Sequence, residues 1–451
     1  MTAPQKRRLD RDSHPSPAGA FFFALSSILL GLLLGSCALI PQSGPPPAPP
    51  VLSVELSSEE AAAHLHWRPA AGRDFLGYEV QRVLGQGTEW RGVARLDARL
   101  DTAWSDGELQ GNQQYRYRVA AHFGAKGRIR RTLASGEAGG SIHHHTGTWP
   151  LPEGFLPTRM AVGPDGNIAV AGAGAGRVER FDAQGRPLGG WTFAGSPPAC
   201  LETGTLDAVS LGFDRQGALH LAYNLPAEGR APGLRWAKFD AQGQLLWERT
   251  LKGLFARHLA VGPGDRIYIE CIDRLYQFDA EGVPVAEYAV PPLLISGLRF
   301  WGDRFSLLVE PANYLEMGWQ APRLMVYDSP AHRQAQWWVG REPLSVQDPG
   351  RGVLKRPSDF AVDAALDRVF IVNAGASRVE VFLGARPLTG WGREGAAAGE
   401  FRFAGELAVL DDLAAGRSIR RRVVGGGITR DTNGNIYVAD TFNNRVQKFA
   451  P

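Results

Sequence analysis

The C-terminal part of the chain repeats one short pattern of apolar and polar positions. Each copy reads arginine, an apolar residue, two free positions and an aromatic residue. The six copies begin at Arg177, Arg235, Arg274, Arg323, Arg378 and Arg445. Short segments of this composition, set between turns, are typical of β-strands. We therefore expect one strand at each copy.

A second apolar run lies upstream of each arginine. The runs are residues 168–171, 219–223, 267–271, 305–309, 369–373 and 436–440. Two short strands joined by a turn, recurring about every fifty residues, are the signature of a β-propeller. Each unit is too small to bury its own apolar face, so the units must stack around a ring. We predict an all-β fold with a six-bladed propeller over residues 142–451.

The best-preserved copies resemble the NHL repeat family. Residues 433–449 follow the family's pattern with little departure, and residues 160–168 follow it over a strand and turn. Copies two and four depart most, because their turns at 224–234 and 311–322 are longer and lack the family's Asp and Asn. The resemblance implies six blades, the number in most described NHL propellers.

The end of the chain predicts how the ring closes. Each blade needs four strands, and the chain stops at Pro451, just after the third strand of the last blade. We expect residues 141–149 to supply the missing outer strand, since pairing the two ends removes an exposed edge. Deleting residues 440–451 should then unfold the propeller. The six repeated arginines follow the symmetry of the fold, so we expect them to be structural and to bond turn carbonyls or acids such as Asp273 and Asp440.

Residues 51–138 also alternate in the manner of strands. The clearest runs are residues 51–56, 63–67, 78–83 and 115–120. Seven short strands in fewer than ninety residues predict a sandwich of two sheets.

Four residues of this segment resemble the core pattern of the fibronectin type III family. They are Trp67, Tyr78, Leu109 and Tyr115, the last two at the family's leucine and tyrosine-corner spacing. The resemblance implies that these side chains pack between the sheets and take no part in chemistry. We expect this domain to be a spacer or a docking module.

The front of the chain reads as an export signal. Residues 1–17 are polar and basic, and residues 18–34 are almost entirely apolar, which is typical of a secretory signal or a membrane anchor. The sequence Leu34-Gly35-Ser36-Cys37 resembles the lipobox of bacterial lipoproteins. That resemblance implies a signal peptide over 1–36, a lipid on Cys37 and a place outside the cytoplasm, in the outer membrane if the host has one. An uncleaved transmembrane anchor is the alternative.

The segment that follows Cys37 is a tether. Residues 41–50 hold six prolines and favour an extended polyproline conformation, so residues 37–50 should lift the folded part off the lipid surface. Among the remaining cysteines, a disulfide between Cys200 and Cys271 and two separate thiols both stay open. The net charge of +3 and the charged fraction of 21% do not point to nucleic acid as a partner.

Candidate ligand-binding residues come from the register of the repeats. The first strand of each blade lines the channel, and the equivalent entry positions are Arg159, Ser210, His258, Gly297, Asp359 and Gly427. The four polar ones, Arg159, Ser210, His258 and Asp359, predict a site for an anionic or polar ligand. A histidine and an aspartate, such as His258 and Asp359, can also act as a general base and the residue that orients it. A ring of solvated loop residues is the alternative.

We predict no metal site and no cofactor. Some six-bladed relatives of NHL proteins are lyases or lactonases that hold a metal with side chains from several blades. Here His220, His258 and His332 do not fall at equivalent positions. Two of His143-His144-His145 would share one face of a strand and bind stray metal weakly. Arg417, Arg420, Arg421 and Arg422 form a basic insertion, which we expect to be a solvated loop or a contact for anionic envelope polymers.

These features together favour a membrane-anchored envelope lipoprotein. Its propeller would serve as a binding or scaffolding module for a protein or a polysaccharide of the envelope. The alternative is a metal-dependent lyase or hydrolase with its active site at the channel. A purely structural assembly component is a third interpretation.

Overall fold

The structure is a computed structural model. It describes residues 47–58, 60–173, 176–192, 209–225, 233–271, 273–290, 294–310, 321–332, 334–341, 350, 352–412 and 417–451. The predicted signal peptide, Cys37, most of the predicted tether and Cys200 lie outside these residues. In the described parts of the chain, no helix is long and apolar enough to cross a membrane.

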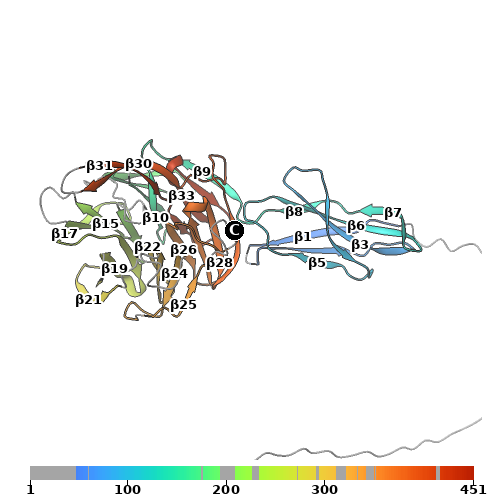
Figure 1. Ribbon diagram of the computed structural model, residues 1–451, viewed down its shortest axis with the longest axis horizontal. Coiled ribbons are helices and arrows are strands. Elements are labelled where there is room, and N and C mark those ends of the chain that lie inside the picture. The colour runs from blue at the N-terminus through green and yellow to red at the C-terminus, as the bar shows by residue number, and fades with distance from the viewer. Residues whose placement is uncertain are drawn as a thin grey trace, which may run out of the picture. The chain divides into compact units, whose positions relative to one another are not determined.

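Six antiparallel sheets of four strands each form the blades of a propeller (Figure 1). Blade 1 holds β10 (Pro157–Val162), β11 (Ile168–Gly172), β12 (Arg177–Phe181) and β13 (Pro187–Thr192). Blade 2 holds β14 (Val209–Phe213), β15 (Leu219–Leu225), β16 (Gly233–Phe239) and β17 (Leu245–Lys252). Blade 3 holds β18 (His258–Gly262), β19 (Arg266–Cys271), β20 (Arg274–Phe278) and β21 (Pro284–Ala289).

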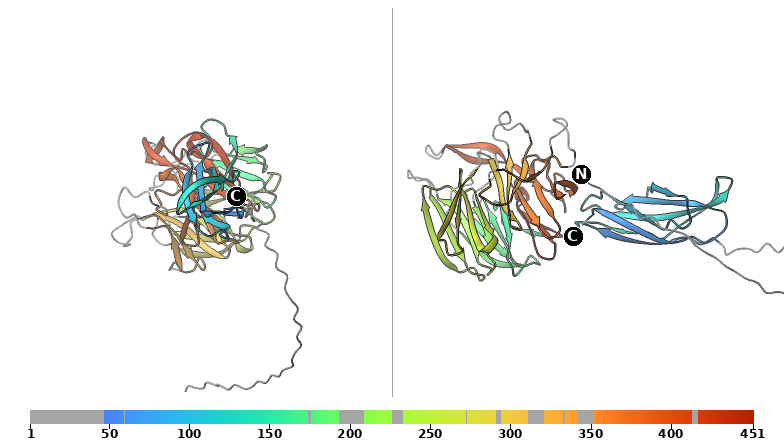
Figure 2. Two further views of the ribbon diagram at one scale, coloured as in Figure 1. Left: turned by 90° about the vertical axis from the view of Figure 1, so that its right-hand side faces the viewer. Right: turned by 90° about the horizontal axis from the view of Figure 1, so that it is seen from below.

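Blades 4 and 5 continue the same order along the chain. Blade 4 holds β22 (Leu294–Trp301), β23 (Arg304–Glu310), β24 (Arg323–Tyr327) and β25 (Trp337–Val339). Blade 5 holds β26 (Asp359–Asp363), β27 (Arg368–Asn373), β28 (Arg378–Leu383) and β29 (Arg386–Trp391). Figure 2 shows the blades from two further sides. The prediction of an all-β chain with propeller blades is confirmed.

The sixth blade combines both ends of the propeller segment. Its strands are β32 (Ile428–Arg430), β33 (Ile436–Asp440), β34 (Arg445–Phe449) and β9 (His145–Pro150). Strand β9 pairs antiparallel with β34 from Arg445 opposite Pro150 to Phe449 opposite His145. The predicted closure is therefore confirmed, with the donor strand ending one residue later than expected. The inner strands β32 and β10 also contact each other, so the ring is continuous.

Aspartates shape many of the turns between the strands. In the turn between β12 and β13, the Oδ1 atom of Asp182 accepts the backbone N–H of Gln184 and of Arg186, both at 2.9 Å. Gly185 in this turn has φ +82°, a conformation that glycine adopts without steric cost. The same geometry recurs at Asp214, Asp240, Asp279 and Asp431. Each side chain satisfies turn amides that would otherwise need water.

The repeated arginines take structural roles. The Nε atom of Arg445 donates to Asp440 Oδ2 at 2.7 Å, and its Nη atoms reach carbonyls of the preceding loop. In four other blades the arginine pairs with a glutamate of its own or the adjacent strand, as Arg378 does with Glu380 at 2.9 Å and Arg274 with Glu287 at 2.5 Å. These contacts fix strand edges and explain why the residue recurs.

Residues 51–140 form two further sheets. One has the order β1 (Val51–Ser57), β2 (Ala62–Arg68), β5 (Ala103–Asp106). The other has the order β4 (Arg91–Leu96), β3 (Phe75–Leu84), β6 (Tyr115–Ala125), β7 (Arg128–Ala134), with β8 (Ala138–Gly140) paired to β6. The described strands number eight, one more than expected, because β8 returns along β6. Trp67 and Tyr78 meet in the shared core at 5.5 Å between ring centroids.

The basic insertion of the last repeat is not a plain loop. Its backbone forms a two-stranded hairpin of β30 (Ala404–Asp412) and β31 (Arg417–Val424), with Ala404 opposite Val424 and Val409 opposite Ile419. The expectation of a solvated loop at Arg417, Arg420, Arg421 and Arg422 is therefore wrong for the backbone. The side chain of Arg422 is exposed.

His143 is buried where the chain passes from the two-sheet domain to the propeller. Its ring stacks on Trp391 at 5.0 Å and meets Phe370 edge-on at 5.8 Å. Within the described residues neither ring nitrogen has a hydrogen-bond partner. Burial, with a further contribution from Arg368, lowers the pKa of His143 to about 3. The residue therefore serves as an uncharged aromatic wedge, not as one of a metal-binding pair.

The first prediction concerns ring closure. Deleting residues 440–451 removes β34 and leaves β9 without a partner, so we expect loss of the cooperative thermal transition. Deleting only Ala450 and Pro451 keeps β34 and should lower the melting temperature by a few degrees at most. Calorimetry on both truncations makes the comparison. A retained cooperative transition in the longer deletion would refute the closure.

The second prediction concerns pH. The pKa of His143 is about 3 in the fold and about 6.5 in an unfolded chain. The unfolded state therefore binds one more proton as the pH falls from 6.5 toward 3, and stability present above pH 6.5 is lost over this interval. His143→Phe keeps the stacking and should reduce the slope of unfolding free energy against pH by up to about 1.4 kcal/mol per pH unit. Urea unfolding at several pH values tests this, and identical slopes would contradict it.

Candidate ligand site in the propeller channel

The structure brings the predicted entry residues together, but as a closed plug. Arg159, on β10 of blade 1, is 5% exposed. Its guanidinium donates to the carbonyls of Ser358 at 2.9 Å and Ser296 at 3.2 Å. These carbonyls belong to blade 4 and to the segment that enters blade 5, so Arg159 spans the channel and ties opposite blades together.

His258 and Ser210 complete the plug on the side of blades 2 and 3. The Nε2 atom of His258 lies 3.0 Å from the carbonyl oxygen of Ile295 and donates to it. Burial, reinforced by the charge of Arg159, holds the pKa of His258 well below its usual value. The Oγ atom of Ser210 accepts the N–H of Leu259 at 2.8 Å. Together with Gly297 and Asp359, these residues surround a space of about 10 Å³, which is roughly enough for one water molecule.

Asp359 is held by Arg299, a residue that we did not select from the sequence. The Nη2 atom of Arg299 lies 2.9 Å from Asp359 Oδ2 and also donates to the carbonyl of Ile428 at 3.1 Å. Asp359 Oδ2 further accepts the N–H of Ile428 at 3.1 Å. The carboxylate is thus engaged with Arg299, and the geometry gives no support to its predicted role as the orienting partner of His258.

A larger cavity lies beyond the plug, between the second halves of the inner strands. Its volume is about 220 Å³. Its walls are Ala161, Val162, Leu211, Gly212, Phe213, Leu259, Ala260, Val261, Arg299, Phe300, Ala361, Val362, Thr429 and Arg430. We expected the ligand site at the end where the inner strands enter; the larger space lies at the end where they leave. Long polar side chains fill the entry end, whereas small residues line the exit end.

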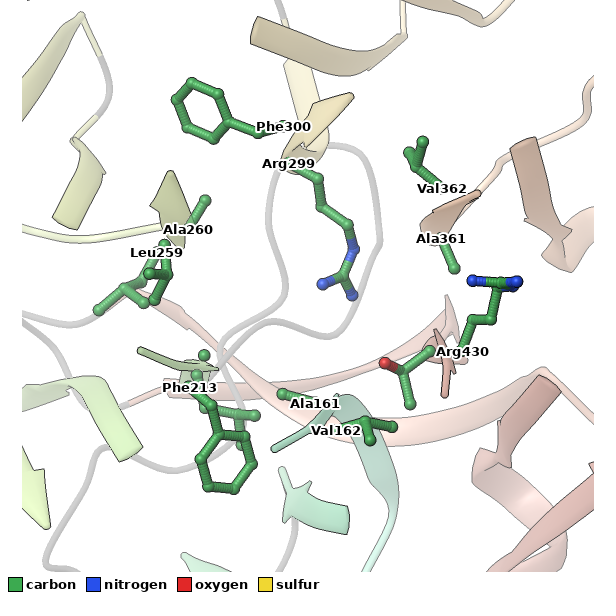
Figure 3. A pocket seen from close by; sticks show the side chains of 14 residues that line it. Ala161, Val162, Phe213, Leu259, Ala260, Arg299, Phe300, Ala361, Val362 and Arg430 are labelled. Carbon is green, nitrogen blue, oxygen red and sulfur yellow. The ribbon is translucent and has the colours of Figure 1, made fainter. Parts of the chain in front are cut away.

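Two arginines, Arg299 and Arg430, are among the residues that line this cavity. In Figure 3 the side chain of Arg299 reaches toward the middle of the channel, and Arg430 lies on the other side beside Ala361. Arg299 and Arg430 are 25% and 22% exposed, so solvent in the cavity reaches both. Most of the other lining residues are small or apolar, so the two arginines are the charged groups that a ligand in the cavity would meet.

The charges around the cavity do not balance. Arg430 pairs with Asp363 at 2.8 Å, and Arg368 lies behind the same carboxylate at 3.3 Å. Asp363 and Asp359 do not themselves line the cavity, so its charged lining residues, Arg299 and Arg430, are both positive. This favours an anion in the cavity.

The repeats contain a signal for this site that the choice of entry positions did not use. Two residues after each entry position, the six blades read Ala161, Gly212, Ala260, Arg299, Ala361 and Thr429. Five of these are small and one is Arg299. One position later they read Val162, Phe213, Val261, Phe300, Val362 and Arg430. Both cavity arginines are therefore the charged exceptions in otherwise small or apolar rows.

The histidines of the repeats do not converge. His220 is buried beside Asp214 at 3.3 Å and near the rings of Trp236 and Trp247, and His332 is exposed near Asp328. Over the part of the chain that the structure describes, no group of three or more His, Cys, Asp or Glu residues is arranged to hold a metal ion. Cys271 is a buried free thiol, and burial raises its pKa to about 12.

Comparison with known proteins agrees with the propeller fold. Residues 426–449 match the family model described as NHL repeat. This match covers β32, β33 and β34. No curated protein sequence matches the chain.

Three solved structures show how distant the likenesses are. Virginiamycin B lyase from Staphylococcus aureus is 10% identical, with 83% of this chain and 99% of that chain covered and a TM-score of 0.37. Hydrazine synthase from Kuenenia stuttgartiensis is 13% identical, with 75% and 92% covered and a TM-score of 0.39. A gluconolactonase from Xanthomonas campestris is 14% identical, with 66% and 87% covered and a TM-score of 0.40. At these values the likenesses carry no argument about activity.

The third prediction tests the pairing of Arg299 with Asp359. Arg299→Met removes the partner of a carboxylate that is 2% exposed, and breaking such a buried pair costs about 3 kcal/mol or more. Adding Asp359→Asn should restore part of the loss, because the carboxamide oxygen still accepts the N–H of Ile428. Arg304→Met at an exposed position is the matched control. Denaturant midpoints that do not differ between Arg299→Met and this control would contradict the assignment.

Proposed function

We propose that the chain is a lipid-anchored protein of the cell envelope whose propeller binds an acidic group of a protein or glycan. The observation that carries the proposal is the channel cavity, whose lining residues include Arg299 and Arg430 and no acidic residue. Its volume of about 220 Å³ is suited to one sugar unit or one acidic side chain. A carboxylate there would accept charge-assisted hydrogen bonds from guanidinium groups.

The residues that line the cavity support a binding role more than a catalytic one. Apolar walls and two fixed cations can recognise an anion. A metal-dependent lyase or hydrolase needs several metal-ligating side chains that converge on one point, and the described residues offer no such set. That alternative remains a prediction without a supporting contact.

We further propose that residues 51–138 are a fibronectin type III-like sandwich that serves as a spacer. Trp67, Tyr78, Leu109 and Tyr115 are all buried in the shared core. The hydroxyl of Tyr115 accepts the N–H of Gln110 at 2.8 Å, which resembles the tyrosine corner of that family. The anchor on Cys37 follows from the lipobox alone, and the outer membrane is its expected place if the host has one.

The fourth prediction tests the ligand class. We expect residues 38–451 to bind glucuronate or N-acetylglutamate. The methyl ester of glucuronate and the dimethyl ester of N-acetylglutamate should bind at least about tenfold more weakly, because they lose the charged hydrogen bonds. Arg430→Met should weaken binding by a similar factor. This position is preferred to Arg299 because Asp363 keeps Arg368 as a second partner. Calorimetric titration measures the affinities of the two carboxylates and their esters for the unchanged protein and for the variant.

The control is Arg386→Met, an exposed arginine on the outer strand β29, which should bind as the unchanged protein does. Preference for glucuronate would indicate a glycan ligand, and preference for N-acetylglutamate a protein. If neither carboxylate binds at millimolar concentration, or if the esters bind equally well, the proposed anion site is wrong.

A further inference from the structure

Three loops and the incoming chain meet at one end of the two-sheet domain. The N–H of Ala48 donates to the carbonyl of Ala71 at 3.1 Å, which places the end of the tether on the β2–β3 loop. An Nη atom of Arg99, from the β4–β5 loop, donates to the carbonyl of Gly72 at 2.6 Å. The N–H of Gly124, beside the β6–β7 turn, donates to the carbonyl of Asp74 at 2.8 Å.

This end carries more basic than acidic residues. The basic ones are Arg68, Arg73, Arg99, Lys126, Arg128 and Arg130, and the acidic ones are Asp74, Asp97 and Asp101. We call these nine residues the basic pole. Six positive charges against three negative ones leave an excess of three, as large as the formal charge of the whole chain, +3. The basic pole therefore carries a net positive charge where the tether arrives.

The basic residues of the pole form no ion pair with another described residue, unlike other arginines of the same domain. Arg82 pairs with Asp106 at 2.7 Å, and Arg116 pairs with Glu137 at 2.9 Å. In the pole Arg99 lies over the ring of Phe75. The other five are exposed, and none of them forms an ion pair with another described residue. Their charge is available to an external anion.

Two large apolar side chains stand beside these charges. Leu100, in the same loop as Arg99, is 82% exposed, and Ile129, between Arg128 and Arg130, is 53% exposed. Exposed apolar residues within a basic patch add nothing to the binding of a soluble polyanion. They do fit the boundary between lipid headgroups and acyl chains, where an apolar tip is buried while basic groups stay among phosphates.

We propose that the basic pole docks on a membrane surface rich in anionic phospholipid. The inference deepens the proposed function and rests on its lipid anchor. Cys37 precedes Pro47 by ten residues, so an extended tether of about 3.1 Å per residue keeps the pole within roughly 30 Å of the membrane. At that range the pole finds the surface at high effective concentration. A lipid chain combined with a basic patch also holds a protein more firmly than either alone.

The experiment is sedimentation of residues 38–451 with vesicles, without the lipid anchor. This chain keeps the whole compact unit from Pro45 to Pro451. We expect it to bind vesicles of phosphatidylglycerol and phosphatidylcholine, to bind pure phosphatidylcholine far less, and to dissociate as salt is raised. Arg128→Glu with Arg130→Glu should weaken binding about tenfold or more.

The matched control reverses two exposed charges outside the pole, Arg91→Glu with Arg304→Glu, and should bind as the unchanged protein does. Leu100→Ser should weaken vesicle binding while leaving its salt dependence in place. Equal binding by the Arg128/Arg130 variant and its control would overturn the proposal. So would binding to soluble polyphosphate that matches vesicle binding and is insensitive to Leu100→Ser, since that result indicates a polymer contact instead of a membrane.

Failure here is distinguishable from failure of the proposed function. Incorporation of labelled fatty acid into the full chain, and its loss in Cys37→Ser, tests the anchor. Carboxylate titration tests the channel. A labelled, ligand-binding protein whose soluble form ignores anionic vesicles would leave the proposed function standing and remove only the docking surface.

Discussion

The pairing of β9 with β34 is the contact on which the rest of the propeller depends. It joins residues about three hundred positions apart and places a strand from before the first blade at the outer edge of the last. The seam then resembles the other blade junctions. Lys448 Nζ donates to the carbonyl of Ala183 across it at 2.9 Å, as Arg180 does to Ala241 between blades 1 and 2 and Lys238 to Ala280 between blades 2 and 3. Without the pairing, two strand edges would be open to solvent and to other chains.

A closed ring fixes six inner strands around one axis, and the channel's character then follows from single residues. At the entry end, Arg159 reaches backbone carbonyls near blades 4 and 5 and closes the passage. At the exit end, small residues in the five other blades leave room for Arg299 of blade 4. The symmetric positions build the scaffold, and the exceptions to symmetry form the candidate site.

The periodic part of this architecture was readable from the sequence. Strand pairs, blade number and the donor strand all follow from repeat spacing and from the point at which the chain stops. The plug was readable only in part. The register identified Arg159, Ser210, His258 and Asp359 as neighbours, but it did not show that each is bonded to backbone groups or to Arg299, nor that they leave almost no space. That outcome depends on side-chain length and on carbonyls of distant blades, such as those of Ser296 and Ile295. Arg299 and Arg430 were missed because only one row of the inner strands was compared, and the two rows that follow it hold both exceptions.

The central claim is that the exit cavity holds an anion between Arg299 and Arg430. The most direct measurement is a crystal structure of residues 38–451 grown with a carboxylated sugar such as glucuronate. The account predicts density for the carboxylate within hydrogen-bonding distance of a guanidinium nitrogen in that cavity, with the plug around Arg159 unchanged. A cavity that holds only water, with the sugar absent or bound elsewhere on the propeller, would contradict it.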